Sequence, residues 1–252
     1  MRRYYIISGA LLLLLLALLL LPLPGNLFWI MAPSAVAIWL AAVIYGVSRI
    51  CSGMFLRAEC FAEGCRHKVA LTFDDGPNGP ATDRILAILE RHGAKATFFV
   101  IGRKVEENSE VLCRVKAAGH DLGNHSWSHS YIFPMFRGRR IAAEIRRTNE
   151  ALEKFSGETP RWFRPPFGVT NPNLYRGLQH SPMRVAGWSI RSFDTRNEPA
   201  ERVLRRIDRK LKGGEVVLLH EHSRNIGEIL ESLLSLMAEK GLEAVSLDCL
   251  FD

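Results

Sequence analysis

The hydrophobic and polar positions divide this chain into two unequal parts. From residue 4 to residue 48 there is no charged residue and no histidine. As one helix this stretch would be roughly 67 Å long, about twice the ~30 Å hydrocarbon core of a bilayer. The turn-forming sequence Pro22-Leu23-Pro24-Gly25-Asn26 lies in its middle. The pattern therefore predicts a transmembrane hairpin over residues 1–48, with spans at about 4–21 and 27–47.

A secretory signal peptide is the alternative for this region, because Arg2-Arg3 followed by a run of leucines resembles its first two parts. No convincing small-x-small cleavage site follows the leucines, and a second long apolar stretch does, which favours the hairpin. Basic residues flank the outer ends of both spans, whereas the connecting turn has none. The positive-inside rule then predicts a multi-pass protein of a bacterial inner membrane, with its large domain facing the cytoplasm.

Beyond the hairpin, short apolar runs alternate with amphipathic segments, as is typical of an α/β fold. Residues 49–67 are expected to link the hairpin to a domain over 68–252. Strands are expected at 69–73, 96–101, 184–190, 215–220 and 243–250. Helices are expected at 82–92, 109–118, 139–155 and 226–240. Polar residues follow several of these strands, and in an α/β barrel such strand ends gather around one pocket.

The charge of the chain indicates its partners. The formal net charge of +7 favours contact with something anionic, and membrane lipid headgroups or a phosphorylated lipid suit an anchored chain. The basic residues are not interleaved with aromatic ones as in a nucleic-acid-binding module, so no nucleic acid partner is expected. The arginine-rich segment 137–147 is interpreted as a solvated helix face, with lipid or partner contact as the alternative. The oligomeric state is not indicated.

The cysteines give little indication of structure. They are odd in number and irregularly spaced at Cys51, Cys60, Cys65, Cys113 and Cys249. This pattern predicts no disulfide framework. Cys60, Cys65 and His67 could suggest a metal cluster, but their spacing lacks the usual closely spaced pair of ligands and a fourth ligand. Incidental thiols are therefore the favoured interpretation.

The segment LTFDDGPN, residues 71–78, carries an apolar run directly into two carboxylates and a turn. A solvated turn is one explanation of aspartates beside Gly-Pro. The other is a buried strand that ends by presenting one carboxylate to a metal and one to a water. Neighbouring side chains on an extended backbone point in different directions, so Asp74 and Asp75 could take these separate roles.

Three further motifs carry candidate chemistry. His125 and His129 are four residues apart, so one helical turn would place both imidazoles on the same side, although ordinary surface histidines are the alternative. Two histidines and one carboxylate leave coordination positions open, as in a catalytic metal site. In RPPFG, residues 164–168, two prolines stiffen a loop and hold Arg164, which can keep a carboxylate ionised. In VVLLH, residues 216–220, a strand leads into His220.

Four segments together resemble ordered motifs of the polysaccharide deacetylases with a NodB-homology domain. They are TFDDGP at 72–77, HSWSH at 125–129, RPPFG at 164–168 and LLH at 218–220. The resemblance runs from about residue 68 to the C-terminus and leaves the hairpin unexplained. It implies a distorted (β/α) barrel of the NodB type. It also implies a hydrolase that removes an acetyl or formyl group from an amino sugar with a divalent metal, zinc first and Co²⁺, Ni²⁺ or Mn²⁺ as alternatives.

The resemblance also implies roles at matching positions. The metal ligands would be Asp75, His125 and His129. Asp74 would be the general base that takes a proton from the attacking water, and Arg164 would hold it. His220 would be the general acid that protonates the departing amine, oriented by Asp194. Substrate contacts are expected from Phe167, through its backbone N–H, and from Trp188, Arg191 and Leu218.

One motif departs from the family pattern. Many members carry W-S-x-D-x-x-D-W where this chain has GWSIRSFDT at 187–195. Asp194 matches the aspartate expected to raise the pKa of the acid histidine. Arg191 replaces an acid and Thr195 replaces a tryptophan of the acyl pocket. The substrate specificity of this chain is therefore expected to differ from that of typical family members more than its reaction type does. Arg191 is interpreted as binding a negative group on the substrate, such as a phosphate.

These features favour an N-deacylase of a lipid-linked sugar, by analogy with the aminoarabinose-lipid deformylases of the same superfamily. The enzymatic alternative is a deacetylase of peptidoglycan or exopolysaccharide on the outer face of the membrane. The non-enzymatic alternative is a membrane-anchored binding protein with an inactive deacetylase fold. The complete set of predicted ligands, base and acid argues against the last of these.

Overall fold

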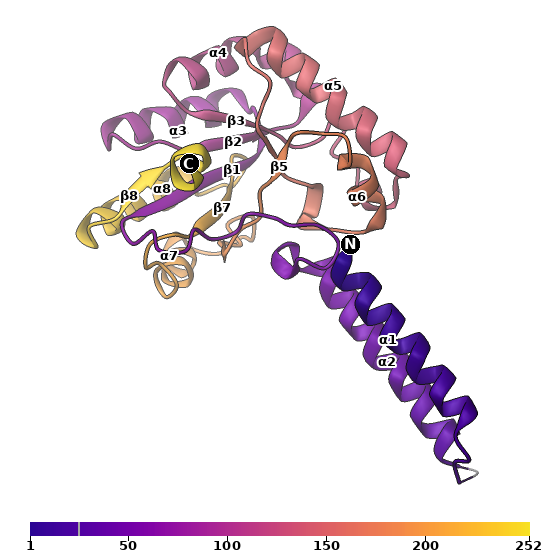
Figure 1. Cartoon of the computed structure of the whole chain (residues 1–252). Coiled ribbons are helices and arrows are strands. Elements are labelled where there is room, and N and C mark those ends of the chain that lie inside the picture. The colour runs from indigo at the N-terminus through magenta and orange to yellow at the C-terminus, as the bar shows by residue number, and fades with distance from the viewer. Residues whose placement is uncertain (25) are drawn as a thin grey trace.

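The computed structural model describes residues 1–24 and 26–252. Its N-terminal helices, α1 (Arg2–Leu20) and α2 (Leu27–Ser48), form an antiparallel pair that projects from the remainder of the molecule (Figure 1). Both are long and apolar enough to cross a membrane, with mean hydropathies of 2.1 and 2.2, and hardly any of either helix is buried. Their bounds lie close to the predicted spans, and they fit a membrane anchor or a signal sequence. Gly25 of the predicted turn lies outside the described residues.

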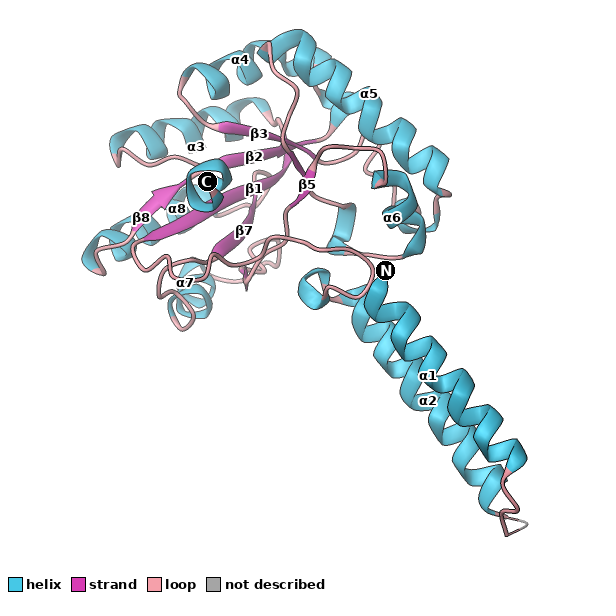
Figure 2. Cartoon of the chain, in the orientation of Figure 1, coloured by secondary structure: helices cyan, strands magenta, loops and turns pink. Residues whose placement is uncertain are grey.

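The rest of the chain is built on one parallel sheet in the order β5-β4-β3-β2-β1-β7-β6, with β8 beside β1 (Figure 2). Its strands are β1 (Lys68–Gly76), β2 (Thr97–Val100), β3 (Asp121–Asn124), β4 (Trp162–Phe163), β5 (Arg184–Val185), β6 (Ile190–Arg191), β7 (Val216–His220) and β8 (Glu243–Val245). Because only residues 186–189 join edge strand β5 to edge strand β6, those edges are at most roughly 18 Å apart. The sheet is therefore curled, which confirms the predicted distorted α/β barrel.

Helices and short 3₁₀ turns surround this sheet. The helices are α3 (Gly79–Arg91), α4 (Ser109–Ala117), α5 (Gly138–Ser156), α6 (Pro172–Leu178), α7 (Ala200–Asp208), α8 (Ile226–Glu239) and α9 (Leu247–Phe251). The 3₁₀ turns are η1 (Ile50–Ser52), η2 (Gly102–Lys104), η3 (Glu106–Asn108), η4 (Phe133–Met135) and η5 (Pro166–Gly168).

Side-chain alternation along β1 separates two cores. Val69, Leu71 and Phe73 pack in a cluster with apolar residues of α3 and α8 outside the barrel. Ala70 instead joins the cluster that includes Phe99 and Trp162. Because successive side chains of a strand point to opposite faces, the inner row of β1 continues through residue 72 to Asp74. The packing that forms the barrel thus delivers this carboxylate to its interior at the end of the strand.

Two predicted strands are wrong in extent. The expected strand at 184–190 is two strands on opposite edges of the sheet, because residues 186–189 cross between those edges. The expected strand at 243–250 stops at Val245, and α9 follows. Ser246 ends the strand by capping that helix, with its hydroxyl accepting a hydrogen bond from the Cys249 N–H at 3.4 Å. The short elements β3, β4, α6 and α7 were not predicted.

The segment between the hairpin and β1 packs on the barrel. The Glu59 N–H donates to the Val185 carbonyl, and the Gly187 N–H donates to the Glu59 carbonyl, both at 2.8 Å. A disulfide joins Cys51 to Cys60 beside Gly187, where a Cβ would lie 2.4 Å from the Cys60 Sγ. The prediction of no disulfide is wrong for this pair, because spacing alone did not show that the chain folds back here. The other three cysteines are thiols.

Candidate active site

A buried ion pair forms one side of the site. Arg164 is fully buried, and its Nη1 donates to Asp74 Oδ1 at 2.7 Å and to Thr72 Oγ1 at 2.8 Å. Burial alone would raise the pKa of Asp74. The positive charge of Arg164, together with its hydrogen bond, outweighs burial, so the pKa of this carboxyl lies below its usual value. Asp74 is therefore held ionised inside the barrel, as predicted from the stiff loop that carries Arg164.

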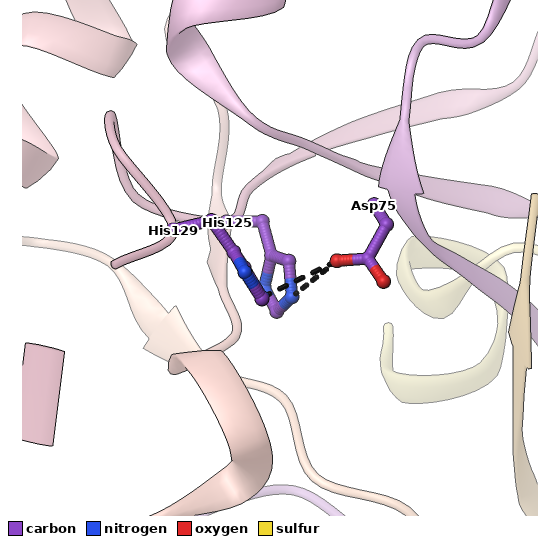
Figure 3. Close-up of side chains that lie close together, drawn as sticks. All are labelled: Asp75, His125 and His129. Carbon is purple, nitrogen blue, oxygen red and sulfur yellow. Dashed lines mark ion pairs between the residues drawn. The ribbon is translucent and has the colours of Figure 1, made fainter. Parts of the chain in front are cut away.

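Asp75, His125 and His129 converge beside this pair (Figure 3). Asp75 Oδ1 lies 3.6 Å from Nε2 of His125 and 3.3 Å from Nε2 of His129. This oxygen is buried and has no hydrogen-bond partner within the described part of the chain. An unpartnered oxygen facing two ring nitrogens is the arrangement that a bound cation would satisfy.

The protonation of the two histidines suits metal ligation. His125 Nδ1 lies 2.7 Å from the Arg164 carbonyl oxygen, which can only accept, so Nδ1 carries a proton and Nε2 is the nitrogen that faces Asp75. Burial and the neighbouring His125 lower the pKa of His129 to about 4. One carboxylate and two imidazoles are a donor set for a divalent metal with open positions, so the residues present fit the implied ion.

The backbone brings these ligands together in a way that the sequence did not indicate. Asp75 has a φ of 69°, and the pairing of β1 with β2 shifts between Phe73 and Gly76. The predicted helical turn around the histidines is wrong, since residues 125–129 form a loop after β3. His129 itself has a φ of 46°, and its N–H donates to Ser126 Oγ at 3.1 Å. Left-handed backbone at residues other than glycine costs on the order of 1–3 kcal/mol each and is concentrated at functional sites.

A second pair forms the opposite side. His220 lies at the end of β7, and its Nδ1 donates to Asp194 Oδ1 at 2.9 Å, while its backbone N–H donates to Asp194 Oδ2 at 2.8 Å. Burial would lower the pKa of His220, but the hydrogen bond and the charge of Asp194 outweigh burial, so this pKa lies above its usual value. The hydrogen bond from Nδ1 to Asp194 thus favours the protonated imidazole and leaves Nε2 for the pocket.

Both sides open into one cleft of about 240 Å³. It is lined by Asp74, Asp75, His125, His129, Phe167, Gly168, Trp188, Arg191, Thr195, Leu218, His220 and His222. The structure thus brings together all the predicted site residues, with Arg164 and Asp194 standing behind Asp74 and His220. A Cβ on Gly168 would lie 2.2 Å from the Trp188 ring, so this position needs glycine. A larger groove of about 1020 Å³ contains none of these residues.

Three polar residues near the ligands were missed. His222 Nδ1 lies 3.4 Å from Asp75 Oδ2, and Lys104 Nζ donates to the Asp75 carbonyl at 2.7 Å. Glu221 is buried, accepts a hydrogen bond from the Thr82 hydroxyl, and has its pKa raised to about 7 by burial. The nearness of His222 to His220 in the sequence was a usable signal, although β7 ends at His220 and a turn carries His222 to Asp75. Nothing in the sequence indicated that Glu221 would be buried.

Comparisons with known proteins agree with this geometry. A solved CE4 family pseudoenzyme from Bacillus anthracis has a similar fold, with a TM-score of 0.69 and 28% identity, covering 74% of this chain and 66% of that one. The chain is 32% identical over 178 residues to the peptidoglycan-N-acetylmuramic acid deacetylase PdaC of Bacillus subtilis, covering 71% of this chain and 37% of the relative. It is 33% identical to a peptidoglycan-N-acetylglucosamine deacetylase of Bacillus cereus, covering 71% of this chain and 69% of the relative.

The family model for polysaccharide deacetylase matches residues 62–186. The chain belongs to the polysaccharide deacetylase family, as its four motifs indicated. It spans less than two fifths of the length of the Bacillus subtilis relative. Its own activity, substrate and partners are therefore matters for proposal.

Proposed function

We propose that this chain is a metal-dependent hydrolase that removes the N-acetyl group of an amino sugar. The observation that carries the proposal is the arrangement of three groups around one cleft. The ligand atoms of Asp75, His125 and His129 lie within 4.8 Å of one another, between the Asp74–Arg164 pair and the His220–Asp194 pair. A binding protein has no physical need for a carboxylate held ionised opposite an imidazole held protonated.

Asp75, His125 and His129 would hold the ion, with zinc as the first expectation and Co²⁺, Ni²⁺ or Mn²⁺ as alternatives. When bound, a divalent cation polarises an acyl carbonyl and makes a water more acidic, which the cleavage of an unreactive amide requires. The protein side chains supply the remaining chemistry.

Asp74 is the proton acceptor for the attacking water, because Arg164 keeps it ionised. His220 donates its Nε2 proton to the nitrogen of the departing amine, because Asp194 keeps the ring protonated. The backbone N–H of Phe167 donates a hydrogen bond to the oxyanion. Trp188 and Leu218 enclose the acyl group at the cleft wall.

The experiment is hydrolysis by the purified full chain in detergent. Acetate and free amine are measured from N-acetylglucosamine oligomers and from peptidoglycan fragments, together with the metal content of the protein. We expect stoichiometric metal, amine release that a chelator abolishes, and a loss of at least about 10³-fold in Asp74→Asn with the metal retained. Metal binding without acyl hydrolysis on either substrate would instead indicate a pseudoenzyme.

The division of the chain and its placement are part of the proposal. Residues 1–48 form a multi-pass membrane hairpin, 49–67 a juxtamembrane segment, and 68–252 the catalytic domain. The Cys51–Cys60 disulfide favours an oxidising compartment, whereas the flanking arginines favoured the cytoplasm. Together with the peptidoglycan deacetylases among its relatives, the disulfide favours the outer face of the membrane and a peptidoglycan substrate.

A lipid-linked amino sugar is the second candidate substrate. Thr170, three residues after Phe167 at the cleft, donates its backbone N–H to the Val47 carbonyl of α2 at 3.1 Å, so the cleft lies near the end of the hairpin.

An alkaline phosphatase fused after Asp252 tests on which side of the membrane the domain lies, because this reporter is active only outside the cytoplasm. We expect it to be active. An inactive phosphatase together with an active cytoplasmic reporter at the same position would contradict the outward placement.

A further inference from the structure

The larger groove, between α5 and α6, is lined by cations. Four arginines contribute to it, and no aspartate or glutamate is among its described lining residues. The arginines are Arg137, Arg139, Arg146 and Arg176, and all are exposed. Only Arg146 forms an ion pair with a described carboxylate, at 3.6 Å from Glu150. The other three guanidinium groups face solvent with their charge uncompensated, which suits an anionic partner.

Glycines allow α5 and α6 to approach closely along the groove. A Cβ on Gly138 would lie 2.8 Å from the Arg176 Cβ, and a Cβ on Gly177 would lie 2.6 Å from the Ile141 Cγ2. The two helices therefore form one rigid unit, and arginines from both belong to a single surface. This groove lies apart from the catalytic cleft, with which it shares no lining residue.

Hydrogen bonds place this surface beside the end of the hairpin. The Thr170 N–H donates to the Val47 carbonyl, and the Thr170 hydroxyl donates to the Gly46 carbonyl, both at 3.1 Å. Asn171 caps α6 immediately after Thr170. Since α6 is only about 10 Å long, Arg176 lies within roughly 20 Å of the last turn of α2. In Figure 1, α6 and the adjoining end of α5 lie on the side of the domain from which the hairpin projects.

An exposed apolar loop adjoins the groove on the same side. Tyr131, Ile132 and Met135 are 90%, 56% and 80% exposed. Asn171, the cap of α6, donates its side-chain N–H to the Pro134 carbonyl at 2.6 Å, which holds the loop beside the groove. Apolar and aromatic side chains next to arginines are the composition of a surface that rests in the headgroup layer of a bilayer.

We propose that the α5–α6 groove is a docking surface for the anionic phospholipid headgroups of the membrane that holds the hairpin. Arg137, Arg139 and Arg176 bind the phosphates, while Tyr131, Ile132 and Met135 enter the headgroup layer. Because Tyr131 also stacks on Phe167 at the cleft, with ring centroids 6.0 Å apart, docking orients the mouth of the active site along the membrane surface. This inference rests on the membrane anchoring proposed above and is independent of the deacetylase activity.

The test is amide hydrogen exchange of the full chain in lipid nanodiscs. Discs of phosphatidylcholine alone are compared with discs that contain a quarter of phosphatidylglycerol. We expect exchange of residues 131–141 and 172–180 to be slowed in the anionic discs by roughly fivefold or more for each arginine engaged. The slowing should disappear in high salt. Equal exchange in both kinds of disc would overturn the proposal.

Matched variants separate this surface from general charge attraction. We expect the triple variant Arg137→Ser, Arg139→Ser and Arg176→Ser to lose the lipid dependence. The same three positions changed to lysine should keep it, since charge is retained. The control triple Arg202→Ser, Arg205→Ser and Arg209→Ser removes the same charge from exposed positions on and just after α7 and should also keep it. Loss of the lipid dependence in this control would contradict a specific surface.

Two further measurements distinguish other causes. Inorganic phosphate added to phosphatidylcholine discs should not reproduce the protection, and full protection by phosphate alone would show a small-anion site instead of a docking surface. Hydrolysis of a soluble N-acetylglucosamine oligomer should be unchanged in the serine triple. A chain that shows no hydrolysis but retains the lipid-dependent protection would contradict the deacetylase proposal and leave the docking surface supported.

Discussion

On each side of the cleft a charged partner shifts the pKa of a titrating group, and the two shifts have opposite directions. On one side, Arg164 lowers the pKa of the buried Asp74, and on the other, Asp194 raises the pKa of the half-buried His220. In each case burial pushes the pKa the other way, and the charged partner outweighs it. A fixed partner behind each titrating group thus favours an ionised carboxylate and a protonated imidazole in one cleft. The titrating groups differ in exposure, because the side chain of Asp74 is 6% exposed and that of His220 is 19% exposed, while the side chains of both charged partners are fully buried.

The largest effect is expected from Arg164→Gln. This change leaves Asp74 as a buried carboxylate without a cationic partner, which should lower the free energy of unfolding by about 3–5 kcal/mol. Hydrolysis should fall by at least about 10³-fold. Urea unfolding and kcat/KM measure the two effects. The double variant Arg164→Gln with Asp74→Asn should recover part of the lost stability, and a simple sum of the two single losses would contradict the pairing argument.

Asp194→Asn is expected to act next most strongly, through the pH dependence. Without the carboxylate, burial dominates and the pKa of His220 falls, so the ring is protonated only at lower pH. The alkaline limb of kcat/KM should therefore move to lower pH, with about 10²-fold less activity at neutral pH. Ser192→Ala, which removes a 2.7 Å hydrogen bond to Asp194 but keeps the charge, should move this limb less. An unmoved limb in Asp194→Asn would remove His220 from the role of acid.

His120 provides a contrast with His220, because it is a buried histidine without a carboxylate partner among the described residues. Burial, aided by the charge of Lys95, lowers its pKa to about 4. The unfolded state therefore binds more protons between pH 6.5 and 4, so this stability contribution is complete above 6.5 and is lost as the pH falls to 4. The full loss is about 3 kcal/mol. His120→Gln should flatten the unfolding free energy over this window relative to the unchanged chain, and an identical slope would contradict the assignment.

Arg191→Ala is expected to give the smallest effect. Its guanidinium lies at the cleft, 4.8 Å from the Phe193 ring centroid, and forms no ion pair with a described residue. If it reads a negative group, kcat/KM should fall about tenfold on an amino sugar that carries a carboxylate or phosphate and stay constant on a neutral one. Equal rates before and after the change on both substrates would exclude this role.

The sequence by itself determined the two apolar helices, the alternation that makes β1 a barrel strand, and the motifs that carry the candidate site residues. These features are local, since each depends on neighbours within one segment. The inner row of β1 leads to Asp74, and the prolines after Arg164 stiffen its loop, so the sequence could indicate where both side chains would lie.

Only the tertiary structure decided how these parts meet. The left-handed backbone of Asp75 and His129, the crossing of residues 186–189 between sheet edges, the fold-back that joins Cys51 to Cys60, and the burial of Glu221 all depend on segments far apart in the chain. The α5–α6 groove shows most clearly that packing brings distant residues together. The pattern of residues 137–147 fits a solvated helix face, and it is the packing of α5 on α6 beside the end of α2 that gathers its charges at one place.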